Sequence, residues 1–248
     1  MEEWDIADLH GSPARRPQHA RPCPTVRTTL HRSQTTATLL AGALALVLGL
    51  AGCADAWDTP HPEPSAIGTP GAGFLPTPTP SPEATVRPVA GSWADVHPSP
   101  GMRVVLLTAG DDEPTRALAS AVQRWASDEG VDLRTVEADG DLTGGIVSAM
   151  GMDPDLIVSA GNDLVDPLAT VSPNHLGQQF LVIGAEIPEP TYNVTSVDWA
   201  GASFRGEGLG GASVFDPASF TPERCGDAIR AGVAAVLTGL TGFVLWID

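Results

Sequence analysis

Lysine is absent from the 248-residue sequence, and all thirteen basic residues are Arg. Acidic residues dominate instead, with 30 Asp and Glu and a formal net charge of −17. From Cys53 onward there are 26 acidic residues against 8 Arg. A surface of this charge repels phosphate backbones and anionic lipid headgroups. It excludes nucleic-acid binding, and it excludes attachment to a membrane through a basic patch.

Cysteine is scarce, with three residues in the whole chain. Cys23 and Cys53 belong to an expected leader and its cleavage point, which leaves Cys225 as the only free thiol of the mature protein. An intramolecular disulfide is therefore excluded. Cys225 shares the apolar face of an expected helix with Ile229 and Val233, so we interpret it as a core residue rather than a nucleophile.

Patterns typical of catalytic and metal sites are also missing. There is no G-x-S-x-G elbow, no P-loop and no His/Cys spacing of a zinc site. His175 is the only histidine of the expected domain, and it lies in a loop. Gly206, Gly208 and Gly211 match a dinucleotide fingerprint as a string, but no helix clearly begins there. The sequence therefore predicts no enzyme, no cofactor and no metal site.

Long hydrophobic runs are limited to residues 38–50, TLLAGALALVLGL. This run is too short to span a bilayer comfortably, since a spanning helix needs about 20 residues. It has the length of the apolar part of a signal peptide, and Arg27 and Arg32 supply the positive charge before it. The sequence that follows, Leu50-Ala51-Gly52-Cys53, resembles a bacterial lipobox.

The lipobox resemblance implies cleavage before Cys53 and acylation of its thiol, with palmitate as one acyl chain. We expect residues 1–52 to be the signal peptide and the acyl chains to anchor the protein on the outer side of the bacterial cell membrane. Acidic residues between Met1 and Thr25 do not fit a leader, so translation is expected to start at Val26. The alternative is an uncleaved buried helix with a chance cysteine.

Proline dominates the next segment, with eleven residues between Ala54 and Pro100. Such a composition favours extended polyproline II and few buried contacts. We therefore expect residues 53–100 to form a disordered spacer that lifts the folded domain from the membrane. A Pro-x-x-Pro ligand for a partner protein is the alternative.

From residue 101 to 248, short apolar runs alternate with helical patterns. The expected strands are 102–108, 131–136, 155–160, 179–184, 194–198 and 243–247, and the expected helices are 113–129, 142–150, 163–170 and 221–239. Continuously apolar strands are typical of a parallel sheet covered by helices on both faces. The predicted fold class is α/β, with a doubly wound, mostly parallel sheet of five or six strands.

Polar residues follow the expected strands at their carboxyl ends, where open α/β sheets bind ligands. The candidate ligand-binding residues are Asp111, Asp112, Gly161, Asn162, Asp163, Glu186, Asp198 and Trp199. Carboxylates, glycine backbone and one aromatic plane would suit a sugar, a nucleoside or a cationic solute. The alternative is that Asp112 and Asp163 only cap the following helices.

Two stretches of this region are similar to the basic membrane protein (BMP) family of substrate-binding lipoproteins. They are DLIVSAGNDLVDPL at 155–168 and QFLVIGAEIPEPTYNVTSVDWAGASFRGEG at 179–208. Ser196-Val197 and the segment 204–208 (FRGEG) mirror motifs of that family, and the resemblance extends over residues 102–211. It implies the type I periplasmic-binding-protein fold. A full member has two lobes, whereas this chain has room for one.

The leader and the resemblance together predict an extracytoplasmic, membrane-anchored solute-binding lipoprotein. We expect it to bind a small polar solute and to assist an ABC permease in transport. The alternative is a non-catalytic surface interaction lipoprotein that has kept a degenerate binding-protein lobe. A ligand on one lobe keeps more water contact than a ligand clamped between two lobes, so the missing lobe favours the alternative.

Overall fold

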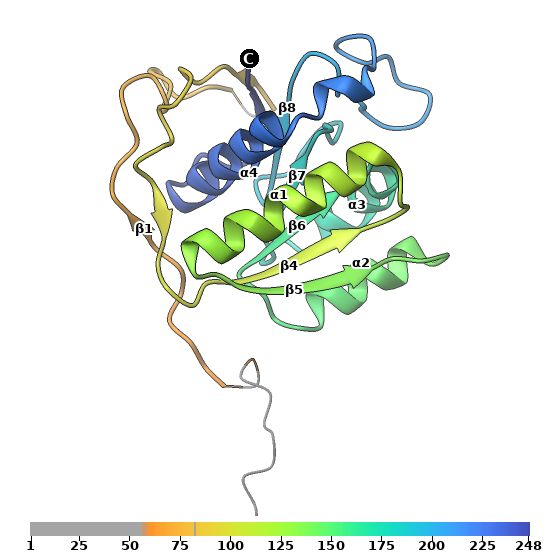
Figure 1. The fold of residues 1–248 in the computed structure, drawn as a ribbon, viewed down its shortest axis with the longest axis horizontal. Helices are drawn as coiled ribbons and strands as arrows, with labels where there is room; N and C mark the ends of the chain where they lie inside the picture. The colour runs from red at the N-terminus through yellow and green to blue at the C-terminus, as the bar shows by residue number, and fades with distance from the viewer. Residues whose placement is uncertain (1–56, 58, 82) are drawn as a thin grey trace, which may run out of the picture. The chain divides into compact units, whose positions relative to one another are not determined.

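The computed structural model describes residue 57, residues 59–81 and residues 83–248 (Figure 1). The expected signal peptide at 1–52, the expected start at Val26 and the expected acylation site Cys53 lie outside the described residues. Within the described part of the chain, no helix has the length and hydrophobicity needed to cross a bilayer.

A seven-stranded sheet forms the middle layer, and every neighbouring pair of strands is parallel. The strand order across the sheet is β2-β9-β8-β7-β6-β4-β5. The strands are β2 (Thr85–Val86), β4 (Arg103–Thr108), β5 (Asp132–Glu137), β6 (Leu156–Ala160), β7 (Phe180–Ile183), β8 (Val194–Asp198) and β9 (Val244–Trp246). Five of them, β4, β6, β7, β8 and β9, are buried along their whole length.

Helices cover both faces of this sheet, and α1 and α4 lie side by side on one of them (Figure 1). The helices are α1 (Glu113–Glu129), α2 (Leu142–Met150), α3 (Val165–Val171) and α4 (Pro222–Leu237). Short 3-10 turns occur at η2 (Asn162–Leu164), η3 (Ser172–Asn174) and η4 (Pro217–Ser219). Side chains alternate along β4, so that Leu106 packs in the α1/α4 layer and Leu107 in the α2/α3 layer.

Local signals explain where the longest helix begins and ends. The Asp112 side chain accepts a hydrogen bond from the Thr115 backbone N–H, which caps the first turn of α1. Pro114 stands in that first turn, where its missing N–H costs nothing. Gly130 ends the helix in the left-handed conformation, at φ 67°. The α/β fold class and its doubly wound parallel sheet are confirmed.

The proline-rich segment differs from the expected disordered spacer wherever the structure describes it. Residues 59–81 and 83–100 lie against the α/β layers, and Phe74 and Trp93 bury their rings in the α1/α4 core. Thr85–Val86 joins the main sheet as β2, and β1 (Ala66–Ile67) pairs with β3 (His97–Pro98) in a small antiparallel sheet. The expectation of a spacer is therefore corrected for these residues, because isolated large apolar side chains pack into the domain core and hold the segment there.

Candidate functional site at the switch point of the sheet

The direction of chain progression reverses between β4 and β6. The chain leaves β4 for the edge strand β5, returns to β6 on the other side of β4, and then continues outward through β7, β8 and β9. At such a switch point the loops that follow the two strands diverge and leave a crevice at the carboxyl ends. The loops concerned are residues 109–112 and residue 161, each followed directly by a helical segment.

A pocket of about 310 Å³ opens at this point. The lining residues are Asp112, Pro114, Thr115, Leu118, Gly161, Asn162, Asp163, Phe215, Pro217 and Phe220. They come from the first turns of α1, the β6 loop and the segment before α4. Four of the eight candidate residues are thus brought together: Asp112, Gly161, Asn162 and Asp163.

The two carboxylates of the pocket have different roles in the structure. Both oxygens of Asp112 are used by Thr115, since Oδ1 accepts from its N–H at 3.0 Å and Oδ2 from its Oγ1 at 2.6 Å. The capping alternative therefore describes Asp112. Asp163 makes no capping hydrogen bond to the η2 turn that contains it. A Cβ placed on Gly110 would lie 3.8 Å from Oδ2 of both side chains, so the two carboxylates face a common space.

Glycine is required at the β6 end of the pocket. Gly161 has φ 118°, a conformation that L side chains rarely adopt. A Cβ there would also lie 2.9 Å from the Ala109 carbonyl oxygen. The loops after β4 and β6 can therefore approach each other only because residue 161 has no side chain, and that approach shapes the floor of the crevice.

The opposite wall of the pocket is aromatic and was not found from the sequence. The rings of Phe215 and Phe220 lie 6.0 Å apart, and Trp199 meets Phe220 edge-on with 5.1 Å between ring centroids. Trp199 is fully buried, Phe220 is nearly so, and Phe215 is 48% exposed. The three rings contact one another in sequence, from Trp199 in the core through Phe220 to Phe215 at the pocket opening. Trp199, expected to contact ligand, instead supports Phe220 from behind.

Asp111 lies apart from the other candidates, in a hollow of about 510 Å³ between β4, β5 and α1. Arg116, Glu137 and Asp139 share this hollow with it. Asp111 and Asp112 are neighbours in the sequence, but they line different pockets on the two sides of the α1 N-terminus. The structure does not join Asp111 to the switch-point pocket.

Glu186 and Asp198 form a buried acidic pair that lines neither of these two pockets. Asp198 Oδ1 accepts hydrogen bonds from the backbone N–H groups of Trp199 and Ser203, both at 2.8 Å. Its Oδ2 meets no donor among the described residues. Glu186 forms a salt bridge with Arg205, in which Glu186 Oε2 lies 2.8 Å from Arg205 Nε. Both acids, expected at the ligand, are held inside the fold.

Burial raises the pKa of Asp198 to about 7, and the neighbouring charge of Glu186 adds to the increase. The two backbone hydrogen bonds oppose the shift without cancelling it. A carboxyl with this pKa is about half protonated at pH 7. The protonated oxygen of Asp198 can then face Glu186, which removes the conflict between two buried charges.

Other sequence features lie away from the pocket. Cys225 is fully buried, and burial raises the pKa of its thiol to about 11, which keeps it protonated. His175 is exposed beside η3. Gly206, Gly208 and Gly211 lie in an irregular loop with no helix starting from them. No group of three His, Cys, Asp or Glu side chains suited to a metal ion occurs in the part of the chain that the structure describes.

Comparison with known proteins gives no family. No family model matches the sequence, and no curated protein matches it. The similarity to the BMP family therefore stays a prediction from the quoted motifs. The fold can still be compared with solved structures.

Three solved structures share part of the fold. An ABC transporter solute-binding protein from Aeropyrum pernix K1 is 23% identical, with 40% of this chain and 29% of that chain covered and a TM-score of 0.36. A fragment from Peptoclostridium difficile 630, provisionally described as a lipoprotein, is 18% identical, with 55% and 98% covered and a TM-score of 0.40. A solute-binding protein of an ABC transporter system from Conexibacter woesei DSM 14684 is 16% identical, with 40% and 35% covered and a TM-score of 0.33.

These similarities are weak. The chain spans about a third of the length of the two solute-binding proteins, and all three TM-scores are below 0.5. They carry no argument about ligand or partner. The functional assignment therefore depends on the geometry of the switch-point pocket.

Proposed function

We propose that the protein is a membrane-anchored, extracytoplasmic binding protein whose switch-point pocket takes a small polar solute. The observation that carries this proposal is the pocket of about 310 Å³ between β4 and β6, at the place where open α/β sheets bind ligands. The lipobox at Cys53 supports the anchor. An ABC permease is the proposed partner, and no catalytic step is proposed.

The chemistry of the pocket limits the class of solute. Phe215 and Phe220 offer flat apolar surface, and Asn162 offers both donor and acceptor groups. The N-terminus of α1 would favour an anion, but the Asp112 and Asp163 carboxylates occupy that region with negative charge. The protein's net charge of −17 also disfavours anions. A neutral or cationic solute with a ring, such as a nucleoside or a sugar, fits best.

The proposal is tested by thermal shift of the mature protein against nucleosides, sugars and amino acids at millimolar concentration. A ligand that binds only the folded state raises the melting temperature. Asn162→Ala is expected to remove the shift, and Asn174→Ala, at the exposed last residue of η3, is expected to retain it. No shift with any compound would contradict solute binding.

A surface interaction protein is the second candidate, and one observation favours it. Leu209, Val214 and Phe215 expose 54%, 88% and 48% of their area on one loop beside the pocket. Apolar groups gathered in this way often mark contact sites for other proteins. The two candidates separate in one experiment: Val214→Ser would leave a solute-induced thermal shift unchanged but weaken binding to a protein partner.

A further inference from the structure

Arg103 holds the chain to the sheet close to the expected lipidation site. It is the first residue of β4 and is only 6% exposed. Its Nη1 donates to the Trp57 carbonyl at 3.0 Å and its Nη2 to the Thr59 carbonyl at 2.8 Å. Releasing this segment would leave a buried guanidinium without those acceptors, which is unfavourable.

Trp57 strengthens this attachment through its ring. The side chain is 6% exposed and belongs to the α2/α3 core. The guanidinium carbons of Arg134 and Arg103 lie 4.2 Å and 5.7 Å from the ring centroid, within the range of cation–π attraction. A large buried aromatic ring within cation–π range of two guanidinium groups fixes the position of residue 57 on the domain.

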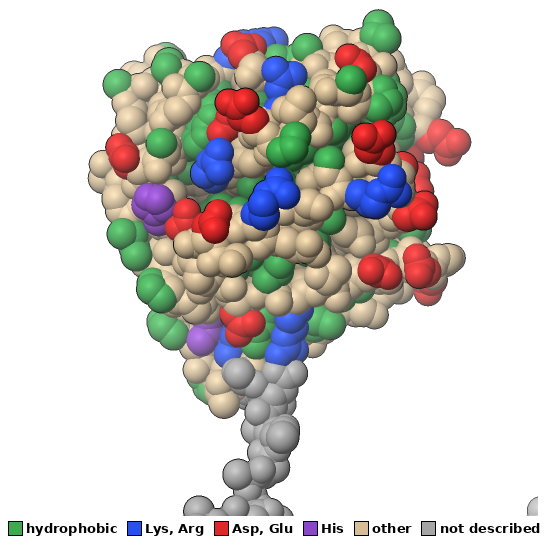
Figure 2. Space-filling model, in the orientation of Figure 1, with side chains coloured by type: hydrophobic (Ala, Val, Ile, Leu, Met, Phe, Trp, Pro, Cys, Tyr) green, Lys and Arg blue, Asp and Glu red, His purple; other side chains and the backbone are tan. Residues whose placement is uncertain are grey.

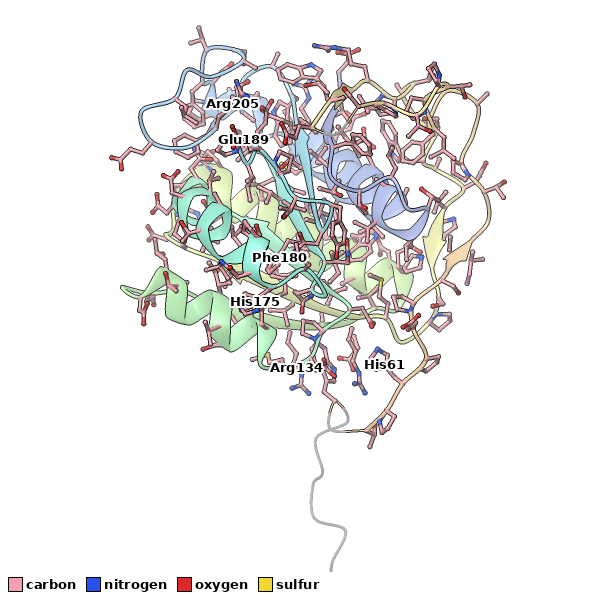
Figure 3. The ribbon with its side chains drawn as sticks, turned by 180° about the vertical axis from the view of Figure 1, so that it is seen from behind. His61, Arg134, His175, Phe180, Glu189 and Arg205 are labelled. Carbon is pink, nitrogen blue, oxygen red and sulfur yellow. The ribbon has the colours of Figure 1, made fainter. Side chains whose placement is uncertain are left out.

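A second contact follows at His61. Its Nε2 lies 2.8 Å from Asp155 Oδ1, and Asp155 Oδ2 accepts the backbone N–H of Arg103 at 2.8 Å. Asp155 immediately precedes β6, so all these contacts lie at the amino end of the sheet. Figure 3 shows His61 and Arg134 at one end of the molecule and Glu189 and Arg205 at the opposite end.

We propose that the amino end of the sheet lies against the membrane and that the switch-point pocket faces away from it. The inference rests on the proposed lipid anchor at Cys53. Three residues lie between Cys53 and Trp57, so four peptide steps join them. Whatever conformation they adopt, they span at most about 14 Å. A free polyproline spacer over residues 53–100 would instead reach on the order of 150 Å.

The orientation places the binding site where a solute arrives from outside. A six-residue strand such as β4 is about 20 Å long, so the pocket at its carboxyl end stands at least that far from the attached end. The folded domain itself provides the separation that a spacer was expected to provide. Figure 2 shows Arg, His and acidic side chains mixed at the lower end of the molecule, so no single sign of charge dominates there.

The orientation is measured by energy transfer from a labelled cysteine to a headgroup dye in phosphatidylcholine vesicles that carry the full lipoprotein. Gly177→Cys precedes β7 at the attached end, and Gly210→Cys lies in the loop after β8 at the pocket end. The two sites are matched, because a Cβ at either meets no atom within 4 Å. Cys225 is buried and Cys53 is expected to be acylated, so the label goes to the new thiol.

Transfer is expected to be stronger from position 177 than from position 210, by a difference that corresponds to about 20 Å. Inserting about 20 Gly/Ser residues between Ala54 and Asp55 adds roughly 25 Å of flexible chain and should weaken transfer from position 177. Equal transfer from both sites on an acylated, membrane-bound protein would overturn the orientation alone. If mass spectrometry shows Cys53 without lipid, the anchor and the orientation both fail.

Discussion

Asp198 and Glu186 place two carboxyl groups side by side in the interior, and within the described part of the chain only Glu186 has a cationic partner. Burial and the Glu186 charge raise the pKa of Asp198 from 3.8 to about 7. Between these two values the folded state binds a proton that the unfolded state releases. The contribution of Asp198 to stability is therefore present below pH 4 and is lost as pH rises toward 7.

Asp198→Asn is expected to stabilise the protein at pH 8. The amide keeps an acceptor for the N–H groups of Trp199 and Ser203 and offers a donor toward Glu186. The gain in the free energy of unfolding should be on the order of a few kcal/mol at pH 8 and should shrink toward pH 4. Urea denaturation at both pH values checks this. Asp128→Asn, at an exposed position on α1, should leave the pH profile unchanged, and a profile equally unchanged by Asp198→Asn would contradict the assignment.

Arg205→Met should destabilise the fold by leaving Glu186 buried without a cation. We expect a loss of about 1 to 3 kcal/mol, less than for a fully buried pair because the Arg205 side chain is 44% exposed. Arg230→Met breaks the Arg230–Asp227 pair, in which both side chains are exposed, and should cost no more than about 0.5 kcal/mol. Chemical denaturation of both variants gives the comparison. Similar losses would show that Glu186 does not depend on Arg205.

Phe74 and Leu75 test whether the proline-rich segment belongs to the folded unit. Phe74 is fully buried, whereas its neighbour Leu75 is 47% exposed. Phe74→Ala should lower the free energy of unfolding by about 3 to 5 kcal/mol. Leu75→Ala should change it by about 0.5 kcal/mol or less. A free spacer would make the two variants indistinguishable in calorimetry.

Two glycines of α4 should respond in opposite directions to alanine. A Cβ on Gly232 would lie 2.5 Å from Leu181 Cδ1, so Gly232→Ala forces the helix away from the sheet and should cost about 1 to 3 kcal/mol. Gly226 has room, with its nearest atoms 3.5 Å away on the Arg230 side chain. Gly226→Ala should therefore gain up to about 1 kcal/mol from helix propensity. Thermal denaturation of the two variants measures the sign of each change.

The order of elements could be predicted because the signals are local. Asp112, Pro114 and Gly130 mark the ends of α1, and the run at 103–108 is too apolar for an exposed strand. The packing of the proline-rich segment could not be predicted, since Phe74 and Trp93 are single apolar residues without a period. Their burial depends on a surface formed elsewhere in the chain.

The candidate site was predicted in part for the same reason. The strand ends placed Gly161, Asn162 and Asp163 near one another, and the structure brings them into one pocket, because parallel strands bring their carboxyl ends to one edge. The aromatic wall was missed, since Phe215 and Phe220 reach the pocket from a loop whose path is set by tertiary contacts. Asp198 was expected to face a ligand, but its carboxyl turns back to bind the N–H groups of Trp199 and Ser203.

Solute binding at the switch point is tested most directly by two-dimensional amide NMR of the soluble mature chain with Cys53→Ser. A compound that gives a thermal shift is titrated into the isotope-labelled protein. We predict that the amide signals of Thr115, Gly161 and Asn162 move with the added compound, while that of Gly177, at the opposite end of the sheet, stays in place. Signals that move at Gly177 and not at the pocket, or none that move at saturating concentration, would contradict the assignment.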